Sequence, residues 1–505
     1  MSDATDAETF CPPASRRFVL VATILASAMG FIDGSVVSIA VPAIRADLGA
    51  SLGEAQWVSN GYMLPMASLI LFGGAAGDRF GLRRVFSLGI AVFVLASLLC
   101  AVAPTPAILI FCRVLQGFGA AFMIPGSLAL IAKAFPREMR GRAIGTWATA
   151  ASLTTIIGPV VGGVMLHWLG NWGWRLVFAI NLPFGLVALT LLWLRVPADP
   201  AAAGRRLDGV GGLLAALGLF GLAYGLTAEG DQAIPPLGHI TLFCGLGIVL
   251  LLAFLAWEAR SAAPMLPLRL FARKTFSGAN ALTFVLYFSL GAISFYQPMT
   301  LIAGWGVKPD QVSLALLPVG ICLTVLSPVS GGLADRFGTA PLIAGGASLV
   351  ALAFAGLALL APQHDLWFGT LPLMALMGIG MGFVVTPLST AVMGSVADAD
   401  TGTASGVNNA VARVAGLLAV ALMGGVAALA FAAAAGPHAG LDLSFGRIPA
   451  AALSDDLERL RVAATDAGFS AVAWCTAALS AISAVIAWLT LDHGPAASRR
   501  LGAKP

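Results

Sequence analysis

The sequence predicts an all-α membrane protein, and three observations lead to this class. Of its 505 residues, 59% are hydrophobic and only 10% are charged, whereas about a quarter of the residues in a soluble domain are charged. The mean hydropathy is +0.92. The apolar residues are also gathered in stretches long enough to cross the roughly 30 Å of bilayer hydrocarbon, which takes about 20 residues of helix. The net charge of +4 gives no argument for a nucleic-acid partner.

Fourteen apolar stretches are separated by clusters of proline, glycine and charged residues. We interpret each stretch as a membrane-spanning helix. The first stretch lacks a clear signal-peptidase site, so we expect it to be retained. The expected spans are 18–40, 57–76, 84–103, 107–132, 142–166, 174–195, 209–227, 237–257, 275–302, 312–334, 340–361, 367–393, 404–432 and 470–491.

The basic residues between the stretches are distributed unevenly. Lys and Arg in short loops favour the cytoplasmic side of a membrane. If the N-terminus is inside, an even number of spans leaves both termini on the cytoplasmic side of the cell (inner) membrane. The longest outside loop is then 433–469, where residues 455–461 form either a short amphipathic helix or a solvated connector. The outside segments hold few basic residues: Arg45, Arg175, Lys308, Arg447, Arg459 and Arg461.

One short sequence occurs twice. Residues 74–81 (GAAGDRFG) follow the second span, and residues 331–338 (GGLADRFG) follow the tenth. Such a repeat predicts two similar halves with the substrate path between them. With six spans in each half, the pair at 209–257 is an insert. The expected domains are 1–17 (cytoplasmic), 18–195 (first six-helix bundle), 196–270 (insert and linkers), 271–491 (second six-helix bundle) and 492–505 (cytoplasmic tail).

Five motifs in order along the chain carry a resemblance to a known family. They are residues 32–42, 74–84, 113–121, 158–163 and 174–185. The chain resembles the major facilitator superfamily and, within it, the fourteen-span drug:proton antiporter family. Three positions depart from that pattern, because Ser35 and Ser38 replace the usual Thr and Asn, and Thr154 replaces a frequent Gly. The resemblance implies a major facilitator fold of 14 transmembrane helices, a monomer, and proton-coupled export of small amphipathic molecules or drugs by alternating access.

Asp33 and Arg113 are ionic residues inside predicted spans. A carboxylate there costs at least about 2.5 kcal/mol unless it is paired, hydrated or protonated. Arginine stays charged in apolar surroundings and therefore needs an anion or water. We hypothesise that Arg113 and Asp33 interact directly or through water, and that Gln116 extends the network. The resemblance implies a role in proton coupling or substrate binding; a salt bridge that only fixes helix packing is the alternative.

The resemblance also implies a conformational latch after the second span. Asp78 would lie at a neighbouring helix N-terminus, where partial positive charge accumulates. The arginines would hold the loop and lipid headgroups, the glycines would allow tight turns, and the second copy of the motif would be weaker. The latch residues are Gly74, Gly77, Asp78, Arg79, Gly81, Arg83, Arg84, Asp335 and Arg336.

The fifth span carries small residues around a proline: Gly158, Pro159, Gly162 and Gly163. Small residues let membrane helices approach closely, and proline removes a helix hydrogen bond. The resemblance implies an antiporter motif that seals the path against leak, although plain helix packing explains the glycines as well.

Further polar residues in the spans either line a substrate cavity or join helices to one another. The deep charges are one acid, Asp33, and two arginines, Arg113 and Arg413. This inventory fits a neutral, zwitterionic or anionic amphipath better than a dication. The candidate lining residues are Tyr62, Asn280, Tyr287, Gln297, Asn408, Asn409 and Arg413.

Two other functions compete with export. A proton-independent facilitator or a nutrient importer would have the same fold, and only transport measurements separate them from an exporter. A membrane-embedded enzyme or receptor needs a convergent catalytic or ligand cluster. The spans contain no deep His, no acid pair, no metal-ligand spacing and no Walker-type loop, and the six cysteines form no Cys-x-x-Cys pair. We therefore expect no enzyme activity, no cofactor and no metal, with protons, a small-molecule substrate and the lipid bilayer as partners.

Overall fold

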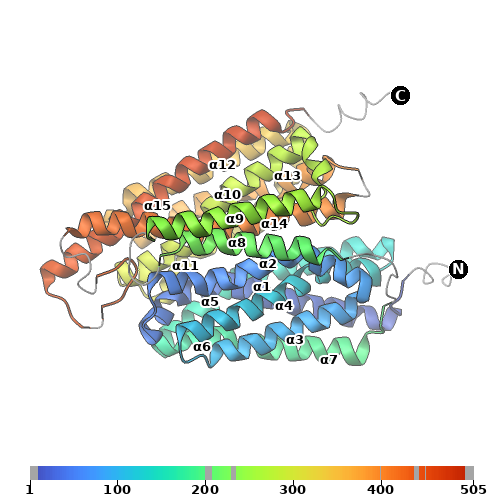
Figure 1. Cartoon of the computed structure of the whole chain (residues 1–505), viewed down its shortest axis with the longest axis horizontal. Coiled ribbons are helices and arrows are strands. Elements are labelled where there is room, and N and C mark those ends of the chain that lie inside the picture. Colours follow the sequence, from blue (N-terminus) through green and yellow to red (C-terminus); the bar gives the residue numbers. More distant parts are fainter. Residues whose placement is uncertain are drawn as a thin grey trace. The chain divides into compact units, whose positions relative to one another are not determined.

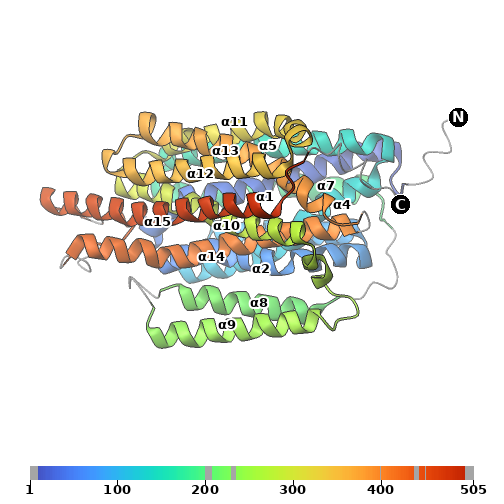
Figure 2. The same cartoon turned by 90° about the horizontal axis from the view of Figure 1, so that it is seen from above.

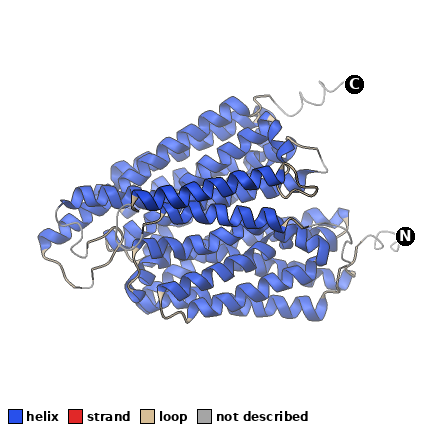
Figure 3. Cartoon of the chain, in the orientation of Figure 1, coloured by secondary structure: helices blue, strands red, loops and turns tan. Residues whose placement is uncertain are grey.

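The computed structural model describes residues 9–199, 207–228, 235–397, 400–436, 443–449 and 451–494. All regular structure in these residues is helical (Figure 3), so the predicted all-α class is confirmed. In the amino-terminal part the helices are α1 (Pro13–Leu48), α2 (Leu52–Phe80), α3 (Leu82–Ala101), α4 (Pro106–Ala134), α5 (Arg137–Leu169), α6 (Trp174–Ala179), α7 (Asn181–Arg195), α8 (Gly209–Leu226) and α9 (Leu237–Glu258). In the carboxyl-terminal part they are α10 (Lys274–Met299), α11 (Pro309–Phe337), α12 (Thr339–Leu360), α13 (Leu371–Gly394), α14 (Thr401–Ala435) and α15 (Asp455–Thr490).

Local sequence explains where these helices begin and end. Pro13 opens α1, where its missing N–H is not needed. Gly49 ends α1 in the left-handed conformation, with a φ of 66°. Thr105 caps α4 because its side chain accepts a hydrogen bond from the backbone N–H of Ile108. Capped helices satisfy the backbone groups that a bilayer cannot.

Twelve helical stretches in the described residues are long and apolar enough to cross a membrane. One of them, Glu138–Arg195, is 58 residues long and contains α5, α6 and α7. Helix α2 is not among the twelve, although its 29 residues form one continuous helix. The chain is therefore a multi-pass membrane protein, while the count of fourteen spans is not confirmed.

The chain divides into two compact units. The first comprises Met1–Ala50, Trp57–Leu222 and Gly245–Met265, and the second comprises Ser51–Gln56, Ala223–Cys244 and Leu266–Pro505. The division passes through α8 and α9, which lie side by side in both views (Figures 1 and 2). The boundaries predicted for two bundles and an insert remain a prediction.

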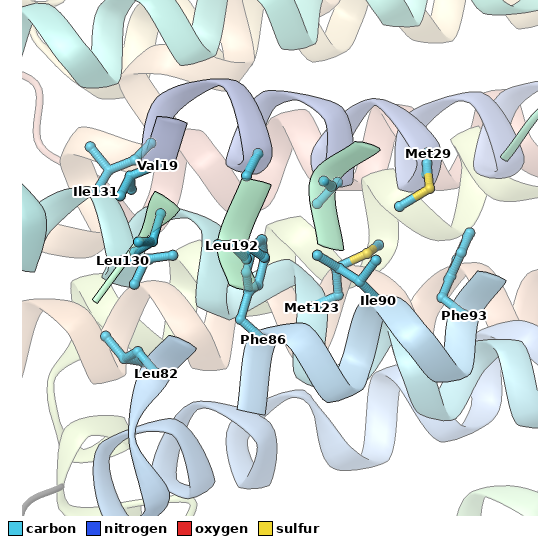
Figure 4. Close-up of a cluster of buried hydrophobic side chains, with 14 of the residues drawn as sticks. Val19, Met29, Leu82, Phe86, Ile90, Phe93, Met123, Leu130, Ile131 and Leu192 are labelled. Carbon is cyan, nitrogen blue, oxygen red and sulfur yellow. The ribbon is translucent and has the colours of Figure 1, made fainter. Parts of the chain in front are cut away.

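The core of the first unit lies where α1, α3, α4 and α7 meet. In a bilayer, such a cluster is stabilised by van der Waals packing of complementary side chains rather than by exclusion of water. The cluster fixes the four helices around the polar residues described below. Its labelled members are Val19, Met29, Leu82, Phe86, Ile90, Phe93, Met123, Leu130, Ile131 and Leu192 (Figure 4).

The repeated sequence forms the same local structure twice. Gly81 breaks the chain between α2 and α3 with a φ of 95°, and Gly338 does so between α11 and α12 with a φ of 89°. These are conformations that favour glycine. In each copy the arginine lies over the ring of the phenylalanine that follows it, at 5.3 Å. The predicted repeat is thus present as a matching pair of helix–glycine–helix junctions.

A residue far along the chain caps the first of these junctions. The Asp199 carboxylate accepts hydrogen bonds from the backbone N–H groups of Leu82 and Arg83, at 2.8 and 2.9 Å. At the second junction, the Asp492 backbone carbonyl accepts from the N–H of Ala340 at 3.0 Å. Each junction is therefore fixed by the segment that follows the last helix of its half, and an acidic side chain at a helix N-terminus also suits the helix dipole.

Three details differ from the sequence prediction. Gly74 and Gly77 make no turns, because both lie inside α2; of the latch glycines in this loop, only Gly81 has a positive φ. The span predicted at 174–195 is divided at Ile180 into α6 and α7. The prediction of a long loop over residues 433–469 is wrong. Helix α14 continues to Ala435, and α15 is already helical from Asp455. The acidic first turn of α15 suits a helix N-terminus, and that preference extends the helix beyond its apolar part.

Several predicted features lie outside the described residues. They are residues 1–8 of the N-terminus, residues 200–206 of the linker, residues 229–234 between α8 and α9, residues 437–442 and 450 of the outside loop, and residues 495–505 of the tail.

Candidate functional site

Asp33, Arg113 and Gln116 come together at the centre of the first unit. Asp33 lies on α1, and Arg113 and Gln116 lie one turn apart on α4. All three are buried: Asp33 and Gln116 are 0% exposed and Arg113 is 2% exposed. The predicted contact between the acid and the arginine is therefore confirmed as a direct one, without a water between them.

The three side chains form a closed set of hydrogen bonds. Arg113 Nη1 donates to Asp33 Oδ2 and to Gln116 Oε1, both at 2.6 Å. Gln116 Nε2 donates to the other carboxylate oxygen, Asp33 Oδ1, at 2.9 Å. Short bonds of this kind are expected where the donor or the acceptor is charged, as the Arg113 guanidinium is. The carboxylate thus has a hydrogen-bond donor on each of its two oxygens.

A second layer of residues holds Arg113 in place. Its Nε donates to the Val58 carbonyl of α2 at 2.9 Å. Its guanidinium carbon lies 4.4 Å from the centre of the Tyr62 ring and 5.5 Å from that of Phe178. Cation–π contacts of this kind favour a desolvated arginine. Tyr62, predicted to line a cavity, is instead buried against the guanidinium.

Gln116 is held by polar residues that sequence reasoning missed. Its Nε2 also lies 3.3 Å from Ser97 Oγ on α3, and Asn181 Nδ2 donates to the same oxygen at 2.9 Å. Ser97 in turn donates to the Phe178 carbonyl at 2.9 Å. The network therefore joins α1, α2, α3, α4, α6 and α7. No sequence signal marks Ser97, since a lone Ser in an apolar helix is also common as a helix contact. Asn181 lies within the motif at 174–185, but that motif does not indicate which residue it bonds to.

The charge of this buried pair depends on whether Asp33 carries a proton. With Asp33 ionised, the pair has no net charge; with Asp33 protonated, Arg113 keeps an uncompensated positive charge in a site that water does not reach. An unpaired buried charge is strongly unfavourable. Protonation therefore favours any conformation that gives Arg113 water or another anion, which is the property a coupling site needs.

Gly158 and Gly162 of the fifth-span motif face α1 beside this network. A side chain at Gly158 would meet Ser35 Oγ at 3.3 Å and Ile32 Cα at 3.5 Å. A side chain at Gly162 would collide with Cγ1 of Val36. A cavity of about 200 Å³ lies along the same contact. Gly163 is buried as well, and Pro159 lies inside α5. Close approach of α1 and α5 thus explains Gly162 directly, and the role of the motif in preventing leak remains a prediction.

We expect Gly162→Ala to destabilise the protein, by about 1–3 kcal/mol, because overpacking displaces the stiff Val36 side chain and with it α1. Gly145→Ala is the matched control. It lies on the same helix, is exposed, and would meet nothing within 4 Å. Both changes raise helix propensity equally. Thermal unfolding of the purified variants should show a loss for Gly162→Ala alone, and equal stability of the two would contradict this packing account.

The predicted latch residues lie at the end of α2 and the start of α3. Asp78 is half-buried and its carboxylate lies 3.7 Å from Lys133 Nζ, at the end of α4. Arg83 donates to the Trp193 carbonyl at 3.4 Å, whereas Arg79 and Arg84 are exposed. In the second copy, Asp335 and Arg336 are exposed. The action of these residues as a latch remains a prediction.

The candidate lining residues of the second unit fall into two groups. Asn408 Nδ2 donates to Thr283 Oγ1 at 2.7 Å and to Asn280 Oδ1 at 3.2 Å, so Asn280 and Asn408 join α10 to α14. Gln297 is also buried, at 2% exposed. The second group, Tyr287, Asn409 and Arg413, is half-buried or exposed. Asn408 is half-buried too, so this residue and the second group have side-chain surface left for a ligand.

Comparison with known proteins identifies a family of membrane transporters. The sequence model of the Major Facilitator Superfamily matches residues 23–420. A probable actinorhodin transporter of Streptomyces coelicolor is 34% identical over 425 residues, which cover 82% of this chain and 73% of that protein. A multidrug resistance protein B homolog of Mycobacterium tuberculosis is 33% identical, with 79% of this chain and 74% of that protein covered.

A third relative and the solved structures agree with this assignment. A tetracenomycin C resistance and export protein of Streptomyces glaucescens is 31% identical over 80% of this chain and 75% of its own length. Among solved structures, a bacterial homolog of the human lysosomal transporter Spinster, inward-facing and occupied, aligns with a TM-score of 0.68 at 18% identity. The alignment covers 95% of this chain and 97% of that one, and it shows a shared fold. The chain is a member of the Major Facilitator Superfamily.

Proposed function

We propose that the protein is a proton-coupled antiporter that exports small amphipathic molecules across the cell membrane by alternating access. The observation that carries the coupling is the buried Asp33–Arg113 pair, 2.6 Å apart and closed by Gln116. Among the described membrane helices of the first unit, Asp33 is the only acid away from a helix end. Intramembrane acids of this kind form proton relays in pumps and transporters.

The relatives support export as the direction of transport and drug-like molecules as the substrate class. The names of these relatives describe antibiotic export and multidrug resistance, at 31–34% identity over about four fifths of this chain. The cytoplasmic placement of both termini, the latch at Asp78 and the leak-sealing role of Gly158–Gly163 belong to the same proposal. A proton-independent facilitator with this fold would keep Asp33 and Arg113 only as a packing salt bridge.

Transport measurements in liposomes distinguish a proton-coupled antiporter from a proton-independent facilitator. A resistance profile, taken in a host that lacks its own pumps, first identifies an exported compound. The purified protein is then reconstituted, and flux of that compound is measured with and without an imposed pH gradient. Antiport predicts that the gradient drives accumulation and that a protonophore abolishes it. Flux that ignores both the gradient and the protonophore would replace antiport with facilitated diffusion.

A further inference from the structure

Two arginines, Arg113 and Arg413, lie deep in the described helices, and only Arg113 has a counter-ion there. Arg113 is neutralised by Asp33 at 2.6 Å. Arg413 lies about a third of the way along the 35-residue α14, roughly 18 Å from the helix start at 1.5 Å per residue. In the described part of the chain its guanidinium makes neither a hydrogen bond nor an ion pair.

The helices around Arg413 offer no acid at that depth. The charged residues of α10 and α11 lie at the ends of these helices, and α12 and α13 contain none. The acids of α15 end at Asp466, in its first third. Because arginine does not give up its proton and an isolated charge is costly within a membrane, Arg413 needs an anion or water from outside these helices.

The face of α14 that carries Arg413 is polar. Asn409, one turn earlier, is exposed, and Ser405 continues the same stripe at helical spacing. Buried apolar residues such as Ala404 and Val407 lie on the other side. A polar stripe with an ionic residue inside a membrane faces protein or a water-filled cavity rather than lipid. The Arg413 side chain is half-buried, so part of its surface is left for a ligand.

The neighbouring helix completes the surroundings of Arg413. Tyr287 of α10 lies between Asn280, which bonds to Asn408, and Gly291, which packs against Gly416, and it is therefore level with Arg413 on α14. One turn before Tyr287, Thr283 accepts the hydrogen bond from Asn408 that ties α10 to α14, so the two helices are held at a fixed distance here. The aromatic pair Phe284–Phe288, with ring centres 6.4 Å apart, lies on the same stretch of α10. The Arg413 guanidinium on α14 therefore lies level with a phenol and two aromatic rings on the neighbouring helix α10.

We propose that Arg413 and Tyr287 form a subsite for the carboxylate of an amphipathic organic acid, and that the exported molecules are anions of this class. A guanidinium binds a carboxylate with two parallel hydrogen bonds, a phenol donates a further one, and the aromatic residues contact the apolar body. The inference rests on the proposed export function, since it names the substrate of that function. A lipid headgroup offers the same anionic chemistry, but headgroups lie at the membrane surface.

Equilibrium binding of three isosteric probes tests the subsite without any gradient. The probes are 1-naphthoate, the neutral 1-naphthamide and the cationic 1-naphthylmethylammonium, titrated onto protein in phosphatidylcholine nanodiscs. The wild type should bind naphthoate about tenfold more tightly than the amide, as expected for one charge-assisted contact. Arg413→Gln should abolish this preference and Arg413→Lys should keep part of it. Arg459→Gln, which removes an equally positive but exposed side chain, should leave it unchanged.

The outcomes separate the subsite from the proposed function. Equal binding of naphthoate and the amide to the wild type, or an unchanged preference in Arg413→Gln, would overturn the subsite whatever the transport assay shows. Loss of naphthoate binding when phosphatidylglycerol is added, together with lipid that co-purifies with the wild type but not with Arg413→Gln, would assign the site to lipid and overturn it as well. An anion preference that depends on Arg413 would stand even if flux ignored the pH gradient.

Discussion

Asp33→Asn is expected to reduce gradient-driven transport to the level of empty liposomes. The asparagine cannot carry the proton, so a pH gradient no longer changes the charge of the site. Its amide also presents an N–H₂ group where Asp33 now accepts from both Arg113 and Gln116, which disrupts the closed hydrogen-bond set. Accumulation of an exported compound against an imposed pH gradient measures the effect.

Two controls make this result specific to the proton. Exchange of the same compound at equal concentration on both sides needs no gradient, and it should persist in Asp33→Asn if the variant is folded and inserted. Asp47→Asn changes an acid on the same helix that pairs with Arg175 at 3.1 Å near the end of α1, and it should remain coupled. Coupled accumulation at the wild-type rate in Asp33→Asn would remove the proposed proton role.

Much of the helix content could be predicted from the sequence because most of the long helices contain an apolar stretch of membrane-spanning length. Helix α9, predicted at 237–257, forms at Leu237–Glu258. The ends of longer helices could not be predicted in this way. Helix α1 begins at Pro13 and α15 at Asp455, well outside their apolar parts, because polar residues extend a helix once its backbone bonds have begun. Hydropathy therefore predicts which residues lie in the hydrocarbon region of the bilayer, but not where the helix begins and ends.

The partners of Asp33 were partly predictable. A buried acid and a buried arginine each need a counter-charge, so pairing Asp33 with Arg113 follows from charge alone, and Gln116 follows from its place one turn along α4. The other contacts of Arg113 were not accessible to such reasoning. Val58 contributes a backbone carbonyl, which every residue has, and Tyr62 contributes a ring face. Both depend on how α2 packs against α4, which no local pattern encodes.

The hydrogen bonds of Asp199 at the start of α3 are a second example of contacts that no local sequence pattern predicts. Asp199 follows α7 and bonds the start of α3, more than a hundred residues earlier. An acid in a linker has the same appearance in sequence whether it is solvated or caps a distant helix. Once the fold is known, the equivalent position of Asp492 beside Gly338 shows that the internal repeat extends to these tails, beyond the eight residues that match in sequence.

The largest loss of stability is expected for Arg113→Gln. This change leaves Asp33, 0% exposed, as an ionised carboxylate without a counter-charge. Removing one partner of a buried ion pair typically costs about 3–5 kcal/mol. The loss should shrink as the pH is lowered, because protonation removes the unpaired charge. Thermal unfolding in detergent, followed across pH, measures both effects.

The double variant Asp33→Asn, Arg113→Gln decides whether charge or shape causes that loss. Two neutral amides can hydrogen-bond to one another and to Gln116, and replacing a buried ion pair as a whole is often nearly neutral for stability. The double variant should therefore regain most of the stability lost in Arg113→Gln, and the additional pH dependence seen in Arg113→Gln should disappear. Transport coupled to the gradient should remain absent, since no titratable group is left in the pair. A double variant as unstable as Arg113→Gln would mean that Arg113 acts through its packing against Tyr62 and Phe178, and the account of Asp33 as a site governed by charge would fail with it.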